Sequence, residues 1–329
     1  MSRATLILTQ SEIERLVEMP AAIGVIAEAF KAQARGEVVM PPKVYLPLPH
    51  QSDFRAMPVY LAHPPACGIK WVNVHPGNRA NGLPTVMGTV ILNDPATGFP
   101  RAILDGLSIT RLRTGAAAGV AAKALARRDS RLVGLVGCGA QALAQLTALE
   151  AVLPIRQVKV WGYRPHEAQQ FCAAARRQIA AALMPVASVR ACVEAADVIV
   201  TITTSRRPLV RCEWVKPGAH VNAIGADAPG KQELDPRILR QARLIVDDRT
   251  QALHGGEINV SIARGFLKPS DIRGTLGEVL LGRLRGRTRA DEITVFDSTG
   301  IAVHDVALAD AIVRLSRRRR LGRAVCFFR

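Results

Sequence analysis

The segment Arg131–Ala142, RLVGLVGCGAQA, constrains the fold of this 329-residue chain more than any other stretch. Leu132–Val136 is an apolar run that suits a buried strand. Gly137, Gly139 and Ala142 then give the pattern G-x-G-x-x-A, and a helical sequence follows. Glycines let the backbone turn tightly and approach a phosphate, while free N–H groups at a helix start face the negative charge. The segment predicts a nucleotide site; the alternative is an ordinary strand-to-helix turn.

Strands and helices alternate from Arg131 onward. This alternation predicts a parallel, doubly wound α/β sheet of the Rossmann type. After Leu132–Val136, further strands are expected at 158–163, 198–203, 221–225, 244–247 and 293–297.

The residues before Arg131 have a different pattern. Residues 10–35 predict a helix with Ser11 as N-cap and Glu14 three positions on. Strand patterns at 38–60, 69–74, 85–93 and 99–106 predict an antiparallel sheet. An alanine-rich helix at 108–127 is expected to pack closely, and a final helix near 303–316 to return to the first domain. We therefore expect a discontinuous outer domain of the α+β type (1–113 plus 301–329) around an inserted Rossmann dinucleotide-binding domain (114–300).

Composition limits the remaining possibilities. The chain is 49% hydrophobic and 22% charged, enough to bury two cores. No apolar run is long enough to cross a bilayer, and no signal peptide is expected at the start. Six scattered cysteines lack metal-ligand spacing, which predicts no structural metal site and a cytoplasmic location.

The net charge of +17 raises the possibility of a nucleic-acid partner. However, the arginines are spread along the chain and aromatic residues make up only 4%, which leaves few stacking platforms. We therefore interpret the charge as an arginine-rich composition that attracts anionic cofactors and substrates, and expect no nucleic-acid or membrane partner.

Two basic residues in the first domain are candidates for substrate binding. Lys70 lies in the apolar strand GIKWVNV, where it either faces water at an edge or places a positive charge in a cleft. Arg55, in FRAMPVYL, either holds a carboxylate or extends to solvent along its apolar stem.

Three further segments contain candidate catalytic or binding residues. In LRTGAAAG, Thr114 is a candidate cap and Arg113 a candidate anion ligand, although surface charge is the commoner role of one arginine. Asp227 follows a strand, at the crevice where open α/β sheets bind ligands, and is either an acid/base or a turn aspartate. Asp297–Gly300 either lies near a nicotinamide ring or caps the helix that follows.

Taken in order, these stretches resemble the ornithine cyclodeaminase/mu-crystallin family, with the pattern of its archaeal-type alanine dehydrogenase and ketimine reductase members. The resemblance runs over nearly the whole chain. It rests on RAMPVYL, GIKWVNVHPGN, TVMGTVILND, LRTGAAAGVAAK, GLVGCGAQA, IGADAPGKQEL and FDSTG. It implies a homodimer that binds NAD(H) or NADP(H) and acts on a small amino acid or imino acid. It also implies that the outer domain (1–113 plus 301–329) serves substrate binding and dimerisation.

The resemblance also implies residue roles. Lys70 and Asp227 match the catalytic pair, and Arg113 matches a carboxylate ligand. Lys43 stands where cyclodeaminases have an arginine, and it keeps the charge but not the bidentate fork. Met87 falls at a position that lines the substrate. Positions that line the cofactor or the site are Thr85, Thr114, Gly137, Gly139, Ala140, Gln141, Thr203, Lys231 and Ser298.

Two departures from the family pattern bear on specificity. Arg55 stands where ornithine cyclodeaminases have a glutamate for the side-chain ammonium of the substrate. At contact distance this reversal costs about 4 kcal/mol per charge pair at an effective dielectric constant near 20, which disfavours ornithine. After the second Rossmann strand, Gly162 replaces the usual acid and Arg164 follows, which favours NADP(H) slightly over NAD(H).

Hydride transfer at Cα of a small amino acid or its imine is the function these residues favour. It corresponds to an alanine dehydrogenase or to a ketimine or pyrroline-2-carboxylate reductase. The nearest alternative is an ornithine cyclodeaminase, which forms proline and ammonia with NAD regenerated. A second is a binding protein without enzymatic activity, which Lys70, Arg113 and Asp227 argue against because all three are present.

Overall fold

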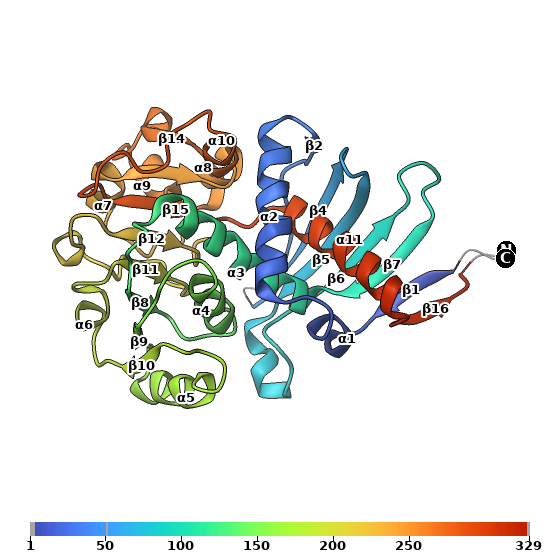
Figure 1. Ribbon diagram of the computed structural model, residues 1–329, viewed down its shortest axis with the longest axis horizontal. Helices are drawn as coiled ribbons and strands as arrows, with labels where there is room; N and C mark the ends of the chain where they lie inside the picture. Colours follow the sequence, from blue (N-terminus) through green and yellow to red (C-terminus); the bar gives the residue numbers. More distant parts are fainter. Residues whose placement is uncertain (1–3, 51, 328–329) are drawn as a thin grey trace. The chain divides into compact units, whose positions relative to one another are not determined.

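A computed structural model describes residues 4–50 and 52–327. The chain divides into two compact units (Figure 1). The first comprises Met1–Arg113 and Ile301–Arg329, and the second comprises Thr114–Gly300. Helix α3 (Gly106–Leu125) carries the chain from the first unit into the second.

The second unit is built on a sheet of eight parallel strands. Their spatial order is β10-β9-β8-β11-β12-β15-β13-β14 (Figure 1). This order confirms the predicted doubly wound Rossmann sheet. The sequence did not reveal β10, which contains a proline, or the short strand β14. The strands are β8 (Leu132–Val136), β9 (Gln157–Trp161), β10 (Ala182–Pro185), β11 (Val198–Thr201), β12 (His220–Ala223), β13 (Arg243–Val246), β14 (Ile272–Thr275) and β15 (Thr294–Asp297).

Hydrophobic clusters cover both faces of this sheet, because successive strand residues point to opposite sides. Val198 and Val200 of β11 pack in one cluster and Ile199 in the other. The small residues of α3 allow the predicted close packing, since a Cβ at Gly115 would lie 2.4 Å from the Ala144 carbonyl oxygen. The helices of this unit, besides part of α3, are α4 (Ala142–Glu150), α5 (Pro165–Ala175), α6 (Val189–Val193), α7 (Pro236–Gln241), α8 (Arg249–Gly255), α9 (Asn259–Ala263) and α10 (Leu276–Leu280), with 3₁₀ turns at Cys212–Trp214 and Pro269–Asp271.

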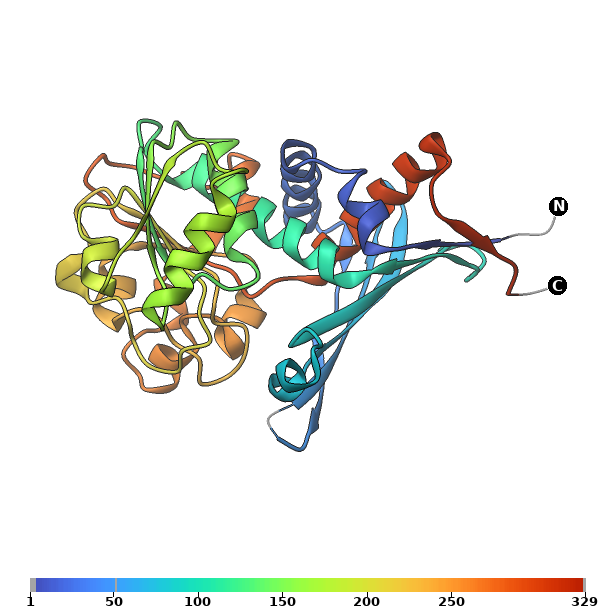
Figure 2. The same cartoon turned by 90° about the horizontal axis from the view of Figure 1, so that it is seen from below.

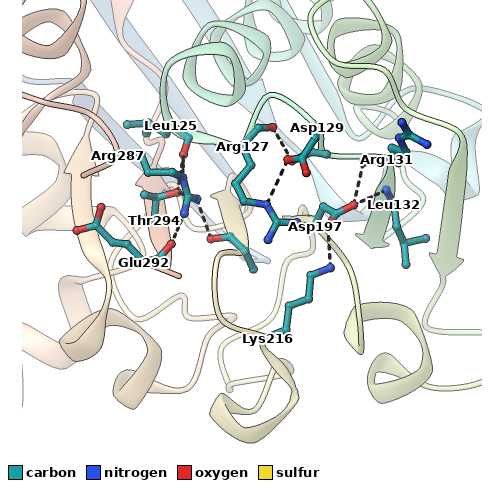
Figure 3. A network of polar contacts seen from close by, with 12 residues as sticks. Leu125, Arg127, Asp129, Arg131, Leu132, Asp197, Lys216, Arg287, Glu292 and Thr294 are labelled. Atoms are coloured by element: carbon teal, nitrogen blue, oxygen red, sulfur yellow. Dashed lines mark hydrogen bonds and ion pairs between the residues drawn. The ribbon is translucent and has the colours of Figure 1, made fainter. Parts of the chain in front are cut away.

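The carboxylate of Asp197 joins the starts of two neighbouring strands (Figure 3). It accepts hydrogen bonds from the backbone N–H groups of Arg131 and Leu132, at 2.8 and 2.9 Å. Arg127 and Lys216 donate to its other oxygen, at 2.7 and 2.6 Å. These contacts lie at the opposite end of β8 from the glycine turn, so we assign them to stability.

The first unit contains a mixed sheet in the order β16-β1-β7-β6-β5-β4-β2, with β3 paired to β4. Its central pairs are antiparallel, as predicted, whereas β1 runs parallel to β7. The sequence did not reveal β1, which consists of only four residues. For the basic C-terminal end, the sequence allowed either a tail or a short strand at 325–328, and the structure shows the edge strand β16. The strands are β1 (Thr5–Leu8), β2 (Val38–Val39), β3 (Val44–Leu48), β4 (Ser52–Leu61), β5 (Ala66–Val74), β6 (Val86–Asn93), β7 (Pro100–Asp105) and β16 (Arg323–Val325).

Two long helices lie on one face of this sheet, α2 (Met19–Ala34) and α11 (Ala302–Arg319) (Figures 1 and 2). The single helix predicted at 10–35 is in fact two, α1 (Gln10–Glu14) and α2, because Pro20 starts a new helix. Thr9, not Ser11, is the N-cap of α1, and its partner is Glu12. A 3₁₀ turn occupies Pro76–Asn81. None of the helices that the structure describes combines the length and apolar character that a membrane span requires.

Candidate active site

Lys70 is buried inside the first unit. It lies in β5, and only 1% of the residue is exposed. Its Nζ donates a hydrogen bond to Oδ1 of Asp305 at 2.8 Å and lies 3.5 Å from Oγ1 of Thr110. Asp305 is completely buried in the first turn of α11. Lys70 therefore does not face water at an edge, which was one of the two positions that the sequence allowed.

Arg113 contacts the same carboxylate. Its Nε donates to Oδ1 of Asp305 at 3.2 Å, so a single oxygen accepts from both Lys70 and Arg113. The other oxygen, Oδ2, is buried and has no hydrogen-bond partner among residues 4–50 and 52–327. When both basic groups are protonated, the cluster carries one positive charge in excess. Such a cluster favours a carboxylate ligand.

The environment makes the proton of Lys70 labile near neutral pH. Burial is the largest influence and lowers the pKa of Lys70 to about 7, although the negative charge of Asp305 opposes this shift. Burial acts to raise the pKa of Asp305, but the two cations outweigh it and the pKa is lowered. Asp305 did not feature among the predicted site residues. The available signal was an acid within the apolar helix sequence AVHDVALA.

Arg55 lies on the same face of the sheet as Lys70. Both are buried, and Met57, two residues after Arg55, pairs with Lys70 across β4 and β5. The guanidinium of Arg55 donates to both oxygens of Asp53, at 2.9 and 3.0 Å, and lies 5.3 Å from the ring centre of Tyr45. Arg55 is thus held inside the unit, and a substrate carboxylate would compete with Asp53 for it.

Lys43, Thr85 and Met87 were also predicted to line the substrate or the cofactor, and they occupy different positions in the first unit. The charge of Lys43 is near enough to Lys70 to lower the pKa of Lys70. Thr85 precedes β6, and its carbonyl accepts from the backbone N–H of His75 at 2.8 Å. Met87 pairs with Asn73, so its side chain lies on the opposite face of the sheet from that of Lys70. The register therefore does not support the prediction that the Met87 side chain lines the substrate.

The glycine turn of the second unit has the geometry expected for a phosphate site. Gly137 has φ of +108°, and a Cβ there would lie 2.8 Å from the Ile202 carbonyl oxygen, so only glycine fits. A Cβ at Gly139 would meet nothing within 4 Å, and the exposed backbone of Gly139 and Ala140 leads to the start of α4 at Ala142. Oε1 of Gln141 is buried without a hydrogen-bond partner in the described part of the chain. The turn geometry and the exposed backbone fit a dinucleotide phosphate, whereas the Gln141 oxygen is an acceptor and could bind only a donor such as a ribose hydroxyl.

The end of β9 explains why the usual acid is missing. A Cβ at Gly162 would lie 2.8 Å from Sγ of Cys138 in the glycine turn, which leaves little space for a side chain. Arg164 follows as the N-cap residue of α5 and is exposed. No acidic side chain occupies positions 161–164.

Asp227 and Lys231 form an ion pair in the loop after β12, with Nζ of Lys231 2.5 Å from Oδ1 of Asp227. Both side chains are partly exposed, at 33% for Asp227 and 18% for Lys231. Asp227 is thus paired with a cation, which a turn aspartate that contacts only its own backbone would not be.

Thr203 and Ser298 follow β11 and β15, which flank β12 in the sheet. Because these strands are parallel, the two residues and the loop of Asp227 lie at the same edge of the sheet. The capping predictions fail nearby. Thr114 lies in the middle of α3, whose start Asp105 caps instead, and the carboxylate of Asp297 accepts from Glu257 and Ile258, not from α11.

A parallel sheet of this order, with a glycine turn after β8, defines the second unit as a dinucleotide-binding Rossmann fold. The family model described as "Ornithine cyclodeaminase/mu-crystallin family" matches residues 3–317. The chain belongs to this family.

Similar proteins include dehydrogenases and reductases. The alanine dehydrogenase of Archaeoglobus fulgidus is 49% identical over 326 residues, 99% of each chain. A solved archaeal alanine dehydrogenase dimer with bound NAD has 47% identity and a TM-score of 0.94, with 99% of this chain and 100% of that chain covered. The Δ1-pyrroline-2-carboxylate reductase of Thermococcus litoralis, in complex with NADH and L-proline, has 33% identity and a TM-score of 0.95, with 98% and 100% covered.

Proposed function

We propose that this protein is an NAD(P)-dependent oxidoreductase that transfers a hydride at Cα of a small L-amino acid or its imine. In one direction it would act as an alanine dehydrogenase, and in the other as a ketimine or pyrroline-2-carboxylate reductase. The buried cluster of Lys70, Asp305 and Arg113 carries the proposal, because it offers charge for a substrate carboxylate beside an amine with a labile proton. The alanine dehydrogenase and reductase relatives support it.

The substrate carboxylate would be held by Arg113 and Lys70, with Arg55 and Lys43 adding positive charge. Fixing this group orients Cα for reaction. Arg55 would repel a second ammonium group such as that of ornithine, by about 4 kcal/mol at contact distance for an effective dielectric constant near 20. Its pairing with Asp53 reduces this repulsion, and the remaining positive charge disfavours a cyclodeaminase.

Proton movements would fall to Asp227 and Lys70. A nicotinamide, when bound, supplies or accepts the hydride. Asp227, partly exposed and paired with Lys231, would exchange a proton with the substrate nitrogen or with the water that forms or hydrolyses the imine. Lys70, with a pKa lowered to about 7, can hold or release a proton in the same pH range.

We propose NAD(H) or NADP(H) as cofactor, with a slight preference for NADP(H). Gly162 offers no acid for the ribose 2′-hydroxyl, and Arg164 adds a cation nearby. The bound NAD and NADH of the two solved relatives argue for the alternative. Kd values of both reduced cofactors for the wild-type protein and for Arg164→Glu test the preference. A variant that loses NADPH binding only would support it, whereas equal losses would contradict it.

We propose a homodimer, since the archaeal structure is a dimer and exposed apolar residues of the first-unit sheet, Val44, Leu46 and Trp71, offer a surface to cover. The proposed cytoplasmic location rests on the scattered cysteines of the sequence, none of which forms a disulfide bond among the residues that the structure describes.

One screen tests the activity. Purified protein is assayed with NADH and NADPH against pyruvate plus ammonia, pyrroline-2-carboxylate and piperideine-2-carboxylate, with ornithine plus NAD as comparison. Turnover that is lost in Lys70→Ala and Asp227→Ala, with cofactor binding retained, supports the proposal. Near-normal rates in both variants would refute the assigned roles. Proline formed from ornithine without net NADH would identify a cyclodeaminase, and cofactor binding without any turnover would favour a binding protein.

A further inference from the structure

Three carboxylates are completely buried behind the loop that carries Asp227. Asp297 ends β15, Glu257 precedes α9, and Glu233 follows the loop. We refer to Asp297, Glu257 and Glu233 as the carboxylate ladder, because the first two each bind backbone N–H groups at and beside the next member.

The first two contacts of the ladder connect β15 to the far end of the loop. Asp297 accepts from the N–H of Glu257 at 2.9 Å and of Ile258 at 3.3 Å. Glu257 in turn accepts from the N–H of Glu233 at 2.9 Å and of Leu234 at 2.7 Å. The position of the loop end is thus set by a side chain that is itself fixed by the end of β15.

The third set of contacts is made by Glu233, at the edge of the sheet where β11 and β12 end. Glu233 accepts from the N–H of Thr203 at 2.6 Å and from the N–H of Gly225 at 2.9 Å. These two amides follow the neighbouring strands β11 and β12. Only glycine fits at 225, since a Cβ would lie 2.3 Å from the Thr203 carbonyl oxygen and 2.4 Å from Oε2 of Glu233. Asp227 lies two residues beyond Gly225.

The middle of the loop is held from the same side. Asn259, in α9, accepts from the N–H of Gly230 and donates to the carbonyl of Lys231, each at 2.9 Å. The loop is therefore fixed at its start by Glu233, in its middle by Asn259, and at its end by Glu257. Asp227 and Lys231 are the charged side chains between these fixed points.

Burying three carboxylates without cations is costly. Among the residues the structure describes, none of the three forms an ion pair, and no group of His, Cys, Asp or Glu is arranged to hold a metal ion. Burial raises the pKa of Glu233 and of Glu257, and raises that of Asp297 to about 8. The three carboxylates therefore bind backbone amides. Apolar side chains of similar volume could not hold these amides in place, because they offer no hydrogen-bond acceptor.

We propose that Glu233 and Glu257 are positioning residues for the reaction, which fix the loop so that Asp227 meets the substrate; this inference rests on the proposed role of Asp227. Neither residue contacts substrate or cofactor in this scheme. Their effect passes through the backbone of Gly225, Glu233 and Leu234, so a small displacement of the loop lowers the rate of the chemical step more than binding.

Glutamine substitutions test the proposal with little change of volume, because an amide offers one acceptor oxygen where the carboxylate offers two. We expect kcat of Glu233→Gln and of Glu257→Gln to be at least tenfold lower than that of wild type, when it is measured well below the melting temperature of each variant. The KM of the substrate found by the screen and the Kd of NADH should each change less than threefold. Asn259→Ala, which frees only the middle of the loop, should act in the same direction and provides the test if a glutamine variant does not fold. Glu194→Gln, at an exposed ion pair with Arg190, is the matched control and should stay within twofold of wild type.

Hydrogen–deuterium exchange supplies a readout that is independent of turnover. One of the amides of Thr203 and Gly225 should exchange at least tenfold faster in Glu233→Gln than in wild type, because the two bind different oxygens of Glu233 and a glutamine keeps only one acceptor oxygen. Unchanged exchange would overturn the proposal, as would a kcat within twofold of wild type in all three loop variants while Asp227→Asn is inactive. A fall in kcat matched by an equal loss of NADH affinity would also overturn it, in favour of a cofactor-binding role. An active Asp227→Asn would instead refute the proposed role of Asp227.

Discussion

Lys70 and Asp305, separated by 235 positions in the sequence, form a completely buried ion pair with an Nζ–Oδ1 distance of 2.8 Å. Arg113 donates to the same oxygen. A buried pair of this kind is sensitive to the loss of either partner, because the remaining charge is left without compensation. Asp305 therefore controls both the position and the protonation of the amine to which we assign catalysis.

Replacement of Asp305 by Asn should lower kcat/KM by at least a hundredfold. It should also destabilise the protein by about 3–5 kcal/mol, the usual cost of breaking a buried ion pair. Because Asp305 raises the pKa of Lys70 from the value that burial alone would give, its loss should move the corresponding limb of the kcat/KM profile to lower pH. Rates between pH 5 and 9 and urea unfolding measure the two effects. Asp291→Asn, at an exposed pair with Arg289, serves as control. A profile that keeps its wild-type position would contradict the assignment of this limb to Lys70.

Two glycines of the turn should differ in what their replacement by alanine changes. Gly139→Ala should leave the melting temperature of the free protein within about 1 °C, because the added Cβ meets no protein atom, and should weaken NADH binding tenfold or more. Gly137→Ala should destabilise the free protein as well, since its Cβ would collide with backbone at a positive φ. Thermal unfolding and fluorescence titration with NADH distinguish the two. Normal NADH affinity in Gly139→Ala would place the phosphate elsewhere.

His220 should make the second unit sensitive to acid. It is completely buried between Thr294 and Asn222, and burial, the largest influence, lowers its pKa to about 3. Between pH 6.5 and 3 the unfolded chain binds a proton that the folded chain does not, so the free energy of unfolding falls by about 1.4 kcal/mol per pH unit as pH decreases. At pH 5 this amounts to about 2 kcal/mol relative to neutral pH.

The pH dependence of His220→Gln isolates this contribution. The stability difference between wild type and variant should shrink by about 2 kcal/mol from pH 7 to pH 5, because only the wild type loses stability through this group. Urea titrations at both pH values provide the measurement. His166→Gln, at an exposed position of α5, should show no such change. A stability difference that is constant with pH would mean that His220 is charged in the folded protein.

Asp197 should contribute to stability without affecting the reaction. Asp197→Asn removes an acceptor oxygen from a network of two cations and two backbone amides (Figure 3). The loss should cost about 1–3 kcal/mol, since a partly buried donor is left unsatisfied. Because the network lies at the start of β8, kcat at 25 °C should stay within twofold of wild type. A larger effect on kcat than on unfolding would show that this end of the sheet is coupled to the reaction.

The sequence was most informative where structure is set by neighbouring residues. The strand Leu132–Val136 has the predicted bounds, and the alternation that follows it yields the predicted doubly wound sheet. Predictions failed where a short range of sequence is ambiguous. Pro20 divides the first helix, and the short strands β1 and β14 lack a distinct pattern.

The candidate site shows the same limit. Lys70, Arg113 and Asp227 were selected from the sequence, but Asp305, Glu233 and Glu257 were not, because each of these acids acts on a partner set by tertiary structure. The register of β5 and β6 also decides that Met87 faces away from Lys70, which the sequence leaves undetermined.

By itself, the sequence determined the glycine turn and its helix, since φ above zero, a close backbone approach and free N–H groups are local properties of a few residues. The tertiary structure alone decided that Lys70 is buried, that Asp305 is its partner, and that the side chains of Glu233, Asn259 and Glu257 fix the loop of Asp227. The physical reason is that a charge in the interior is defined by what surrounds it. Its pKa and its orientation depend on groups that folding brings together from distant parts of the chain.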